Sequence, residues 1–60
     1  MKFKSGDKVK MKYYDRYAYG EVTIAKENES KILFDGNYDL PYWYYLNDEL
    51  ELIKDNEFNK

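Results

Sequence analysis

The 60-residue sequence contains no cysteine and no histidine, and it has only three glycines and one proline. Without cysteine the chain can form no disulfide, and without both residue types it lacks the usual ligands of a zinc site. No apolar run approaches the roughly 20 residues of a membrane-spanning helix, and residues 1–4 lead into no hydrophobic signal segment. We therefore expect no membrane association and a cytoplasmic location.

The missing residue types also argue against catalysis. There is no histidine to act as a general base and no cysteine nucleophile, and Ser5 and Ser30 stand in predicted turns without an activating neighbour. The glycines are too scattered for a phosphate-binding loop. The acidic residues at 48, 49 and 51 lack the regular spacing of a calcium loop. We expect a non-enzymatic protein with no catalytic residue, no cofactor and no metal.

Aromatic side chains are abundant: they make up 20% of the chain, and eight of them are tyrosines. Four are consecutive, at positions 42–45. Wide flat rings favour β-strands, and the alternation of a strand directs Trp43 and Tyr45 to one face and Tyr42 and Tyr44 to the other. One pair can close a core while the other remains available for contact. The sequence alone does not decide which pair is buried.

Hydrophobic alternation and turn residues predict five short strands. These cover residues 8–12, 20–25, 31–35, 42–46 and 50–53, with a tyrosine-rich loop over 13–19 and a single 3-10 turn over 47–49. Five strands at this spacing predict an all-β fold, in which one antiparallel sheet curls into a barrel. We expect this barrel domain to cover residues 1–54 and a flexible C-terminal tail to cover residues 55–60.

The inward positions of these strands give a predicted core. Its members are Val9, Met11, Val22, Ile24, Ile32, Phe34, Trp43, Tyr45, Leu50 and Leu52. A chain of this length hides only about 60% of its unfolded surface. The fold therefore depends on large side chains and has a narrow margin of stability.

Charge is unevenly distributed, although the formal net charge is only −2. Residues 1–16 hold six basic and two acidic side chains, whereas residues 17–60 hold ten acidic and four basic ones. In the first strand Lys8, Lys10 and Lys12 alternate with apolar residues and so point outward. This lysine stripe either keeps an exposed sheet edge from pairing with another molecule, the role that we favour, or contacts phosphates.

Four short motifs follow one another in a recognisable order. They are Gly6-Asp7-Lys8-Val9, Gly20-Glu21-Val22, Phe34-Asp35-Gly36 and Asp48-Glu49-Leu50-Glu51-Leu52. With the long loop expected after the first strand, this order resembles SH3-like barrels over residues 5–54. It is most similar to Tudor and KOW-type members and to small SH3-like proteins of Gram-positive phages. The resemblance implies an SH3-like barrel that serves as a binding module.

Two ligand classes of that family can be compared with this sequence. Tyr13-Tyr14-Asp15 resembles the loop motif of signalling SH3 domains, but the tryptophan pair and the late proline–tyrosine pair that grip proline-rich ligands are missing. A Tudor-like cage for methylated lysine or arginine has comparable positions here. These are Tyr17, Phe34, Tyr38 and Tyr42, of which Phe34 is also a core candidate.

The function that we favour is recognition of a protein partner through a tyrosine-rich surface. Its candidate residues are Tyr13, Tyr14, Tyr17, Tyr19, Tyr38, Tyr42 and Tyr44. Tyrosine offers a large contact area at low entropic cost and is enriched in interface hot spots. A homodimer built on this patch is a variant of the same idea. The alternative is that several of these rings only cover the ends of a small barrel.

Two other binding functions stay open. In the first, the chain binds nucleic acid, with phosphates contacted by Lys8, Lys10, Lys12 and Arg16 and bases stacked on tyrosines. The KOW-type resemblance supports this, and an isoelectric point near 5.0 opposes it. In the second, a phage protein blocks a host enzyme by occupying its basic channel. The side chains that replace phosphates would be Asp35, Asp39, Asp48, Glu49, Glu51 and Asp55.

Overall fold

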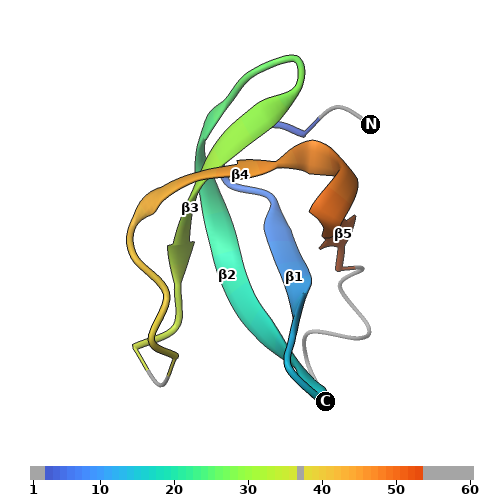
Figure 1. The fold of residues 1–60 in the computed structure, drawn as a ribbon. Coiled ribbons are helices and arrows are strands. Elements are labelled where there is room, and N and C mark those ends of the chain that lie inside the picture. The colour runs from blue at the N-terminus through green and yellow to red at the C-terminus, as the bar shows by residue number, and fades with distance from the viewer. Residues whose placement is uncertain (1–2, 37, 54–60) are drawn as a thin grey trace.

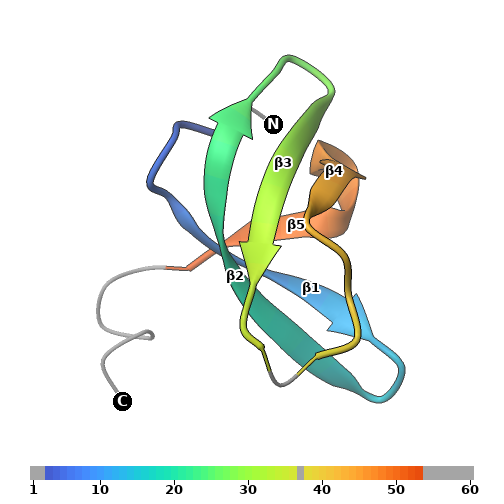
Figure 2. The same ribbon diagram turned by 90° about the vertical axis from the view of Figure 1, so that its left-hand side faces the viewer.

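The computed structural model describes residues 3–36 and 38–53, which form one antiparallel sheet of five strands (Figure 1, Figure 2). The elements are β1 (Lys8–Tyr13), β2 (Arg16–Ala25), β3 (Glu29–Phe34), β4 (Trp43–Leu46), the 3-10 turn η1 (Asn47–Glu49) and β5 (Leu50–Leu52). The prediction of an all-β chain with a 3-10 turn before the last strand is therefore confirmed. The predicted tail over residues 55–60 lies outside the described residues.

The order of strands across the sheet is β4-β3-β2-β1-β5, so β4 and β5 are its two edges. β2 is the longest strand and pairs with both β1 and β3. The sheet curls, and η1 connects its two edge strands (Figure 1). No ladder joins β4 to β5 within the described ranges. The sheet is therefore open, whereas the sequence led us to expect a closed barrel.

The connection between β1 and β2 differs from the sequence prediction. β1 extends to Tyr13, which pairs with Arg16 of β2, so only Tyr14 and Asp15 form the turn. The predicted tyrosine-rich loop is wrong, because most of it belongs to β2 and its Ala18 is fully buried. The turn contains none of the glycine or asparagine residues that mark tight hairpins. Instead Tyr14 itself adopts a left-handed conformation with a φ of 58°.

The core lies on the inner face of the curled sheet and contains most of the predicted residues. Buried as predicted are Val9, Met11, Val22, Ile32, Phe34 and Leu50, and Tyr45 packs against them half-buried. Phe3, Ala18 and Ile53 are also buried, although the sequence did not predict them as core. Three predicted core residues are exposed instead: Ile24 by 43%, Trp43 by 61% and Leu52 by 44%.

A β-bulge explains the exposure of Ile24. Val22 pairs with Ile32 of β3, but Ile24 pairs with Lys31, the residue immediately before Ile32, so β2 contains one extra residue here. A one-residue insertion turns the following side chains to the opposite face. Ile24 therefore lies on the outer face beside Lys31. Simple alternation cannot predict this reversal.

The two other exposed residues lie in the edge strands. Trp43 is in β4, and its ring contacts the ring of Tyr44 with centroids 5.7 Å apart. The sequence predicts that Trp43 and Tyr45 share one face. In the structure Trp43 is exposed, whereas the ring of Tyr45 packs edge-on against the ring of Phe34, with centroids 5.1 Å apart. In β5, Leu52 is exposed and the next residue, Ile53, is buried.

A buried polar cluster connects the β2–β3 hairpin to the end of β4. Asn47 and Ser30 are 2% and 0% exposed, and the Ser30 hydroxyl donates to Asn47 Oδ1 at 2.7 Å. Asn47 Nδ2 donates to the carbonyls of Lys26 and Glu27, at 3.1 and 3.0 Å, and the Asn47 backbone N–H donates to Asn28 at 2.9 Å. Buried polar groups need such partners. The sequence indicated only a polar turn at this position.

Candidate interaction surface

The outer face of the β1–β2 hairpin carries the lysine stripe predicted from the sequence. Its three cross-strand pairs are Lys8 with Glu21, Lys10 with Tyr19 and Lys12 with Tyr17. β1 lies between β2 and β5 and is not an edge of the sheet. The favoured interpretation of the stripe as protection of an exposed edge is therefore wrong.

The lysines of this stripe contact side chains of the neighbouring strand. Lys8 Nζ lies 2.7 Å from Glu21 Oε1, in an ion pair whose side chains are both close to half exposed. The ammonium groups of Lys10 and Lys12 lie 4.9 and 5.5 Å from the centroid of the Tyr17 ring. These distances allow cation–π attraction. We call Lys10, Lys12, Tyr17 and Tyr19 the hairpin face.

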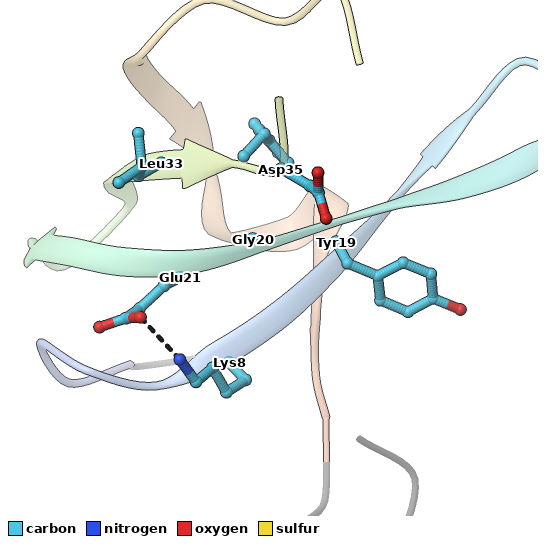
Figure 3. Close-up of a pocket in the computed structure, with 7 residues that line it drawn as sticks. Lys8, Tyr19, Gly20, Glu21, Leu33 and Asp35 are labelled. Atoms are coloured by element: carbon cyan, nitrogen blue, oxygen red, sulfur yellow. Dashed lines mark hydrogen bonds and ion pairs between the residues drawn. The ribbon is translucent and has the colours of Figure 1, made fainter. Parts of the chain in front are cut away.

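An open hollow of about 260 Å³ adjoins the hairpin face, over the neighbouring strands β1, β2 and β3 (Figure 3). It is lined by Lys8, Tyr19, Gly20, Glu21, Leu33, Phe34 and Asp35. Leu33 is 55% exposed and Tyr19 is 42% exposed, so both rims present apolar atoms to solvent. The acidic and basic groups of the lining partly compensate each other, as the Lys8–Glu21 pair shows. A hollow of this size suits one inserted side chain of a partner better than a complete small-molecule substrate.

The tip of the hairpin groups three of the predicted tyrosines. The ring of Tyr13 lies 4.7 Å from that of Tyr14 and 6.0 Å from that of Tyr38, both in edge-on geometry. Tyr13 and Tyr38 pack against the core. These two rings therefore fit the alternative interpretation from the sequence, in which some tyrosines only cover the ends of the fold. Tyr14 is 83% exposed, and the neighbouring Arg16 is exposed as well.

A second group of aromatic side chains lies over β3 and β4 around Lys31. The ammonium group of Lys31 is 4.5 Å from the ring centroid of Tyr42, 5.6 Å from Trp43 and 5.8 Å from Tyr44. Lys26 adds a second cation, 4.5 Å from Tyr44. We call these five residues the lysine–aromatic cluster.

The lysine–aromatic cluster was only partly predicted. Tyr42 and Tyr44 were candidate contact residues, but Lys26, Lys31 and Trp43 were not. Alternation in the third predicted strand indicates that Lys31 points outward. The sequence does not show that Lys31 pairs with Tyr44 across the two strands, so the signal for this cluster was incomplete.

The positions of a Tudor-like cage do not converge. Phe34 is 7% exposed within the core, Tyr38 contacts Tyr13, and Tyr17 belongs to the hairpin face. Tyr42 belongs to the lysine–aromatic cluster, with Lys31 above its ring. Within residues 3–36 and 38–53 no ring contact joins any two of these four positions. The cage suggested by the resemblance is therefore not formed by these residues.

The acidic residues considered as phosphate substitutes lie on several different elements. Asp35 lines the hollow, Asp48 and Glu49 lie in η1, and Glu51 is the central residue of β5. Asp39 precedes β4 and is exposed like the others, and Asp55 lies outside the described residues. In the part of the chain that the structure describes, no three acidic residues are grouped so as to hold a metal ion.

Tyr45 is the tyrosine with a shifted pKa. Desolvation by burial raises the pKa of its hydroxyl above the ordinary tyrosine value. The same hydroxyl donates a hydrogen bond of 2.7 Å to the carbonyl of Pro41, which ties the preceding loop to β4. Ionisation of Tyr45 removes this donor.

This environment predicts a loss of stability in alkaline solution. The pKa of Tyr45 is higher in the folded protein than in the unfolded chain. Its contribution to folding stability is therefore fully present below about pH 10, the pKa of an unfolded tyrosine. This contribution is lost as the pH rises through the pKa of the folded state. We expect the stability advantage of the wild type over Tyr45→Phe to be about 1 kcal/mol at neutral pH and to shrink above pH 10. Urea unfolding of both proteins from pH 7 to 11.5 measures it. Tyr14→Phe, altered at an exposed ring, is the control, and an advantage that does not change with pH would contradict the prediction.

Comparison with protein-family models, curated proteins and solved structures finds no match for this chain. Within the described residues, no helix has the length and apolar character needed to cross a membrane. The function must therefore be argued from the side chains and their arrangement.

Proposed function

We propose that the chain is a non-enzymatic, cytoplasmic SH3-like module that binds a protein partner through its hairpin. The main support for this proposal is the conformation of Tyr14, which has a left-handed backbone and an 83% exposed ring at the hairpin tip. Left-handed geometry costs a residue other than glycine roughly 1–2 kcal/mol. The ring of Tyr14 is exposed and makes an edge contact with Tyr13, so packing does not explain why a tyrosine occupies this strained position. Strained residues often serve a function.

The surface next to Tyr14 supports the same function. Tyr17 and Tyr19 continue from the tip along the outer face of β2, and the hollow lies beyond them. Tyrosine is enriched in protein interfaces and among their hot spots. The lysine–aromatic cluster extends this surface on the far side of Leu33, where Tyr42 is 47% exposed.

The SH3-like assignment is supported by the strand order and by the position of η1. The terminal strand β5 pairs with β1 and follows directly on η1. The long first loop that formed part of the resemblance is a two-residue turn in the structure, so the strand order and η1 carry the assignment. A phage origin, which rests on the resemblance, and the inhibition of a host factor, which rests on the acidic residues and the small size of the chain, are part of this proposal.

The sharpest test separates binding from folding at Tyr14. Glycine accepts the left-handed conformation without strain, so we expect Tyr14→Gly to keep stability equal or raise it by up to about 1 kcal/mol while weakening partner binding. A partner is first captured from a lysate of the source cells, with and without nuclease, and its affinity is then measured by calorimetry. Unchanged affinity for Tyr14→Gly would remove the main support for the proposal.

A second variant tests how far the surface extends. Tyr42→Ala is expected to weaken binding by about 2 kcal/mol, as hot-spot residues do, and to leave the fold intact because the ring is partly exposed. Leu52→Ala, which truncates a residue of similar exposure on β5, is the matched control. If Tyr42→Ala and Leu52→Ala behave alike, the contact surface does not reach the lysine–aromatic cluster.

Nucleic-acid binding is the second candidate, favoured by the two lysines beside Tyr17. A ring flanked by cations could stack on a base while the lysines contact phosphates. The carboxylates of Glu21 and Asp35 in the neighbouring hollow oppose this function. Loss of all captured material after nuclease treatment, together with loss of binding in Lys10→Glu, would favour this candidate over the first.

A further inference from the structure

The edge strand β4 has one side without a partner strand. Its residues Trp43 to Leu46 pair with Ile32 to Glu29 of β3, and on the other side the described residues supply no strand. Figure 2 shows β4 at the margin of the sheet, next to β3. In an edge strand, alternate residues direct their backbone N–H and C=O groups outward, where they can pair with another strand.

This four-residue edge strand carries no charged side chain, proline or bulge, three of the features that prevent such pairing. Charged side chains, proline and bulges normally protect sheet edges, yet β4 contains only aromatic and aliphatic residues. Trp43 and Leu46, its first and last residues, are 61% and 54% exposed. The opposite edge differs, because β5 is only three residues long and has the exposed Glu51 at its centre.

The strand can also pair with a second copy of itself. When two copies of β4 are aligned antiparallel with Tyr44 opposite Tyr44, Trp43 lies opposite Tyr45 of the second copy, and Leu46 lies opposite Tyr42, the residue that precedes β4. Each position then faces an apolar or aromatic side chain, and cross-strand pairs of this kind are favourable. No charged residue lies within this segment, so no like charges are directly opposed across the two strands; the nearest cations, Lys31 and Lys26, lie over its rings in each copy. Another protein would need a similarly apolar strand, whereas a second copy always provides one.

We propose that a second copy of this chain adds to β4 in antiparallel orientation, giving a symmetric dimer with one continuous sheet. The interface is the edge strand and not the hairpin, so this inference does not rest on the proposed function. Because Tyr14 lies in the β1–β2 turn, Tyr14→Gly is expected to leave dimerisation unchanged.

Sedimentation equilibrium of the purified protein between 5 and 500 μM tests this inference. We expect a monomer–dimer equilibrium in the wild type. Trp43→Lys and Leu46→Lys, which place the missing charge on the edge, should each raise the dissociation constant at least tenfold. Leu33→Lys is the matched control, because Leu33 is 55% exposed on the face of the inner strand β3, and it should change the constant less than twofold. Circular dichroism checks that each variant is folded. If one of the two edge variants is unfolded, the other still provides the test.

Two results would overturn the proposal. One is a monomer at every concentration, even if another protein were found to bind β4. The other is a dimer that survives both edge variants and is lost in Leu33→Lys, because the interface would then be the outer face.

The absence of cysteine from the chain allows a direct test of the register. Directly opposed side chains in an antiparallel pair have Cβ atoms about 4.5–5.5 Å apart, close to disulfide range. Tyr44→Cys should therefore form a disulfide-linked dimer under mild oxidation, and Tyr17→Cys, on the hairpin face, should not. Equal cross-linking of the two variants would contradict pairing centred on Tyr44.

Discussion

Replacing Asn47 by aspartate is expected to remove a large share of the stability of the protein at neutral pH. The side-chain amide donates to two backbone carbonyls, at 3.1 and 3.0 Å, and a carboxylate at the same place would direct negative charge toward both oxygens. A buried charge without a partner costs about 3–5 kcal/mol. A domain of this length has a total stability of only about 3–9 kcal/mol, at roughly 0.05–0.15 kcal/mol per residue. Urea unfolding followed by tryptophan fluorescence measures the difference.

The β2–β3 hairpin that Asn47 contacts offers a matched control for this change. Asn28→Asp adds the same charge to this hairpin, but the Asn28 side chain is exposed. We expect it to cost less than about 0.5 kcal/mol, as surface substitutions usually do. The defect of Asn47→Asp relative to the wild type should shrink as the pH falls toward 4, because the protonated carboxyl regains one donor. Similar losses in the two variants would mean that added negative charge matters and the hydrogen bonds do not.

The role of Asn47 also shows what the sequence could and could not predict. Strand alternation identified most of the fold, because Val9, Met11 and Val22 alternate with polar residues as an inner face requires. Asn47 looked like part of a solvated turn. Its burial depends on the β2–β3 hairpin, whose carbonyls lie about 20 residues away along the chain. Long-range partners of this kind leave no local signal.

Two other errors have similarly specific causes. The bulge between Val22 and Ile24 reversed the face of Ile24, and nothing in the local alternation marks an inserted residue. The hairpin turn at Tyr14 was missed because it uses a tyrosine where tight turns usually have glycine or asparagine. Both departures from local rules bring an exposed side chain, Ile24 or Tyr14, onto the surface, and such departures are expected at functional or strained sites.

The candidate site was predicted in composition but not in arrangement. The sequence named Tyr17, Tyr19, Tyr42 and Tyr44, and all four lie on the hairpin face or in the lysine–aromatic cluster. It did not predict that the tyrosines would divide between these surfaces and the hairpin tip, because the division depends on strand register. Lys31 is the clearest omission, since its three ring contacts all come from the β4 region.

Gly20→Ala is expected to be the most destabilising of the small substitutions in this chain. Gly20 lies in β2 between Val9 of β1 and Phe34 of β3, where the sheet is closely packed. An added Cβ would lie 2.9 Å from the Leu33 carbonyl oxygen and 3.0 Å from Phe34 Cα. Both atoms belong to the backbone of β3, so relief requires a shift of the strand. Inserting a methyl group where packing is this close costs about 2–3 kcal/mol.

Gly36 provides a control, because replacing it by alanine is expected to raise the stability of the protein and not to lower it. Apart from the two chain neighbours of Gly36, no atom of the described residues lies within 4 Å of a Cβ added there, and the backbone of Gly36 is not in the left-handed region. Alanine there should stabilise the protein by about 0.4–1 kcal/mol, because it restricts the unfolded chain. Thermal unfolding of both variants measures the contrast. If both glycines respond alike, the close approach of β2 and β3 at Gly20 does not limit the fold.

The Gly20 result also bears on the hollow beside the hairpin face. Gly20 and Leu33 both line it, so a shift of β3 that accommodates the new methyl group must move Leu33 relative to Tyr19. A folded Gly20→Ala protein is therefore expected to bind a hairpin-directed partner more weakly than its stability alone explains. Partner affinity measured on the folded fraction tests this. A normal affinity would mean that the hollow contributes nothing and that the contact is confined to Tyr14 and Tyr17.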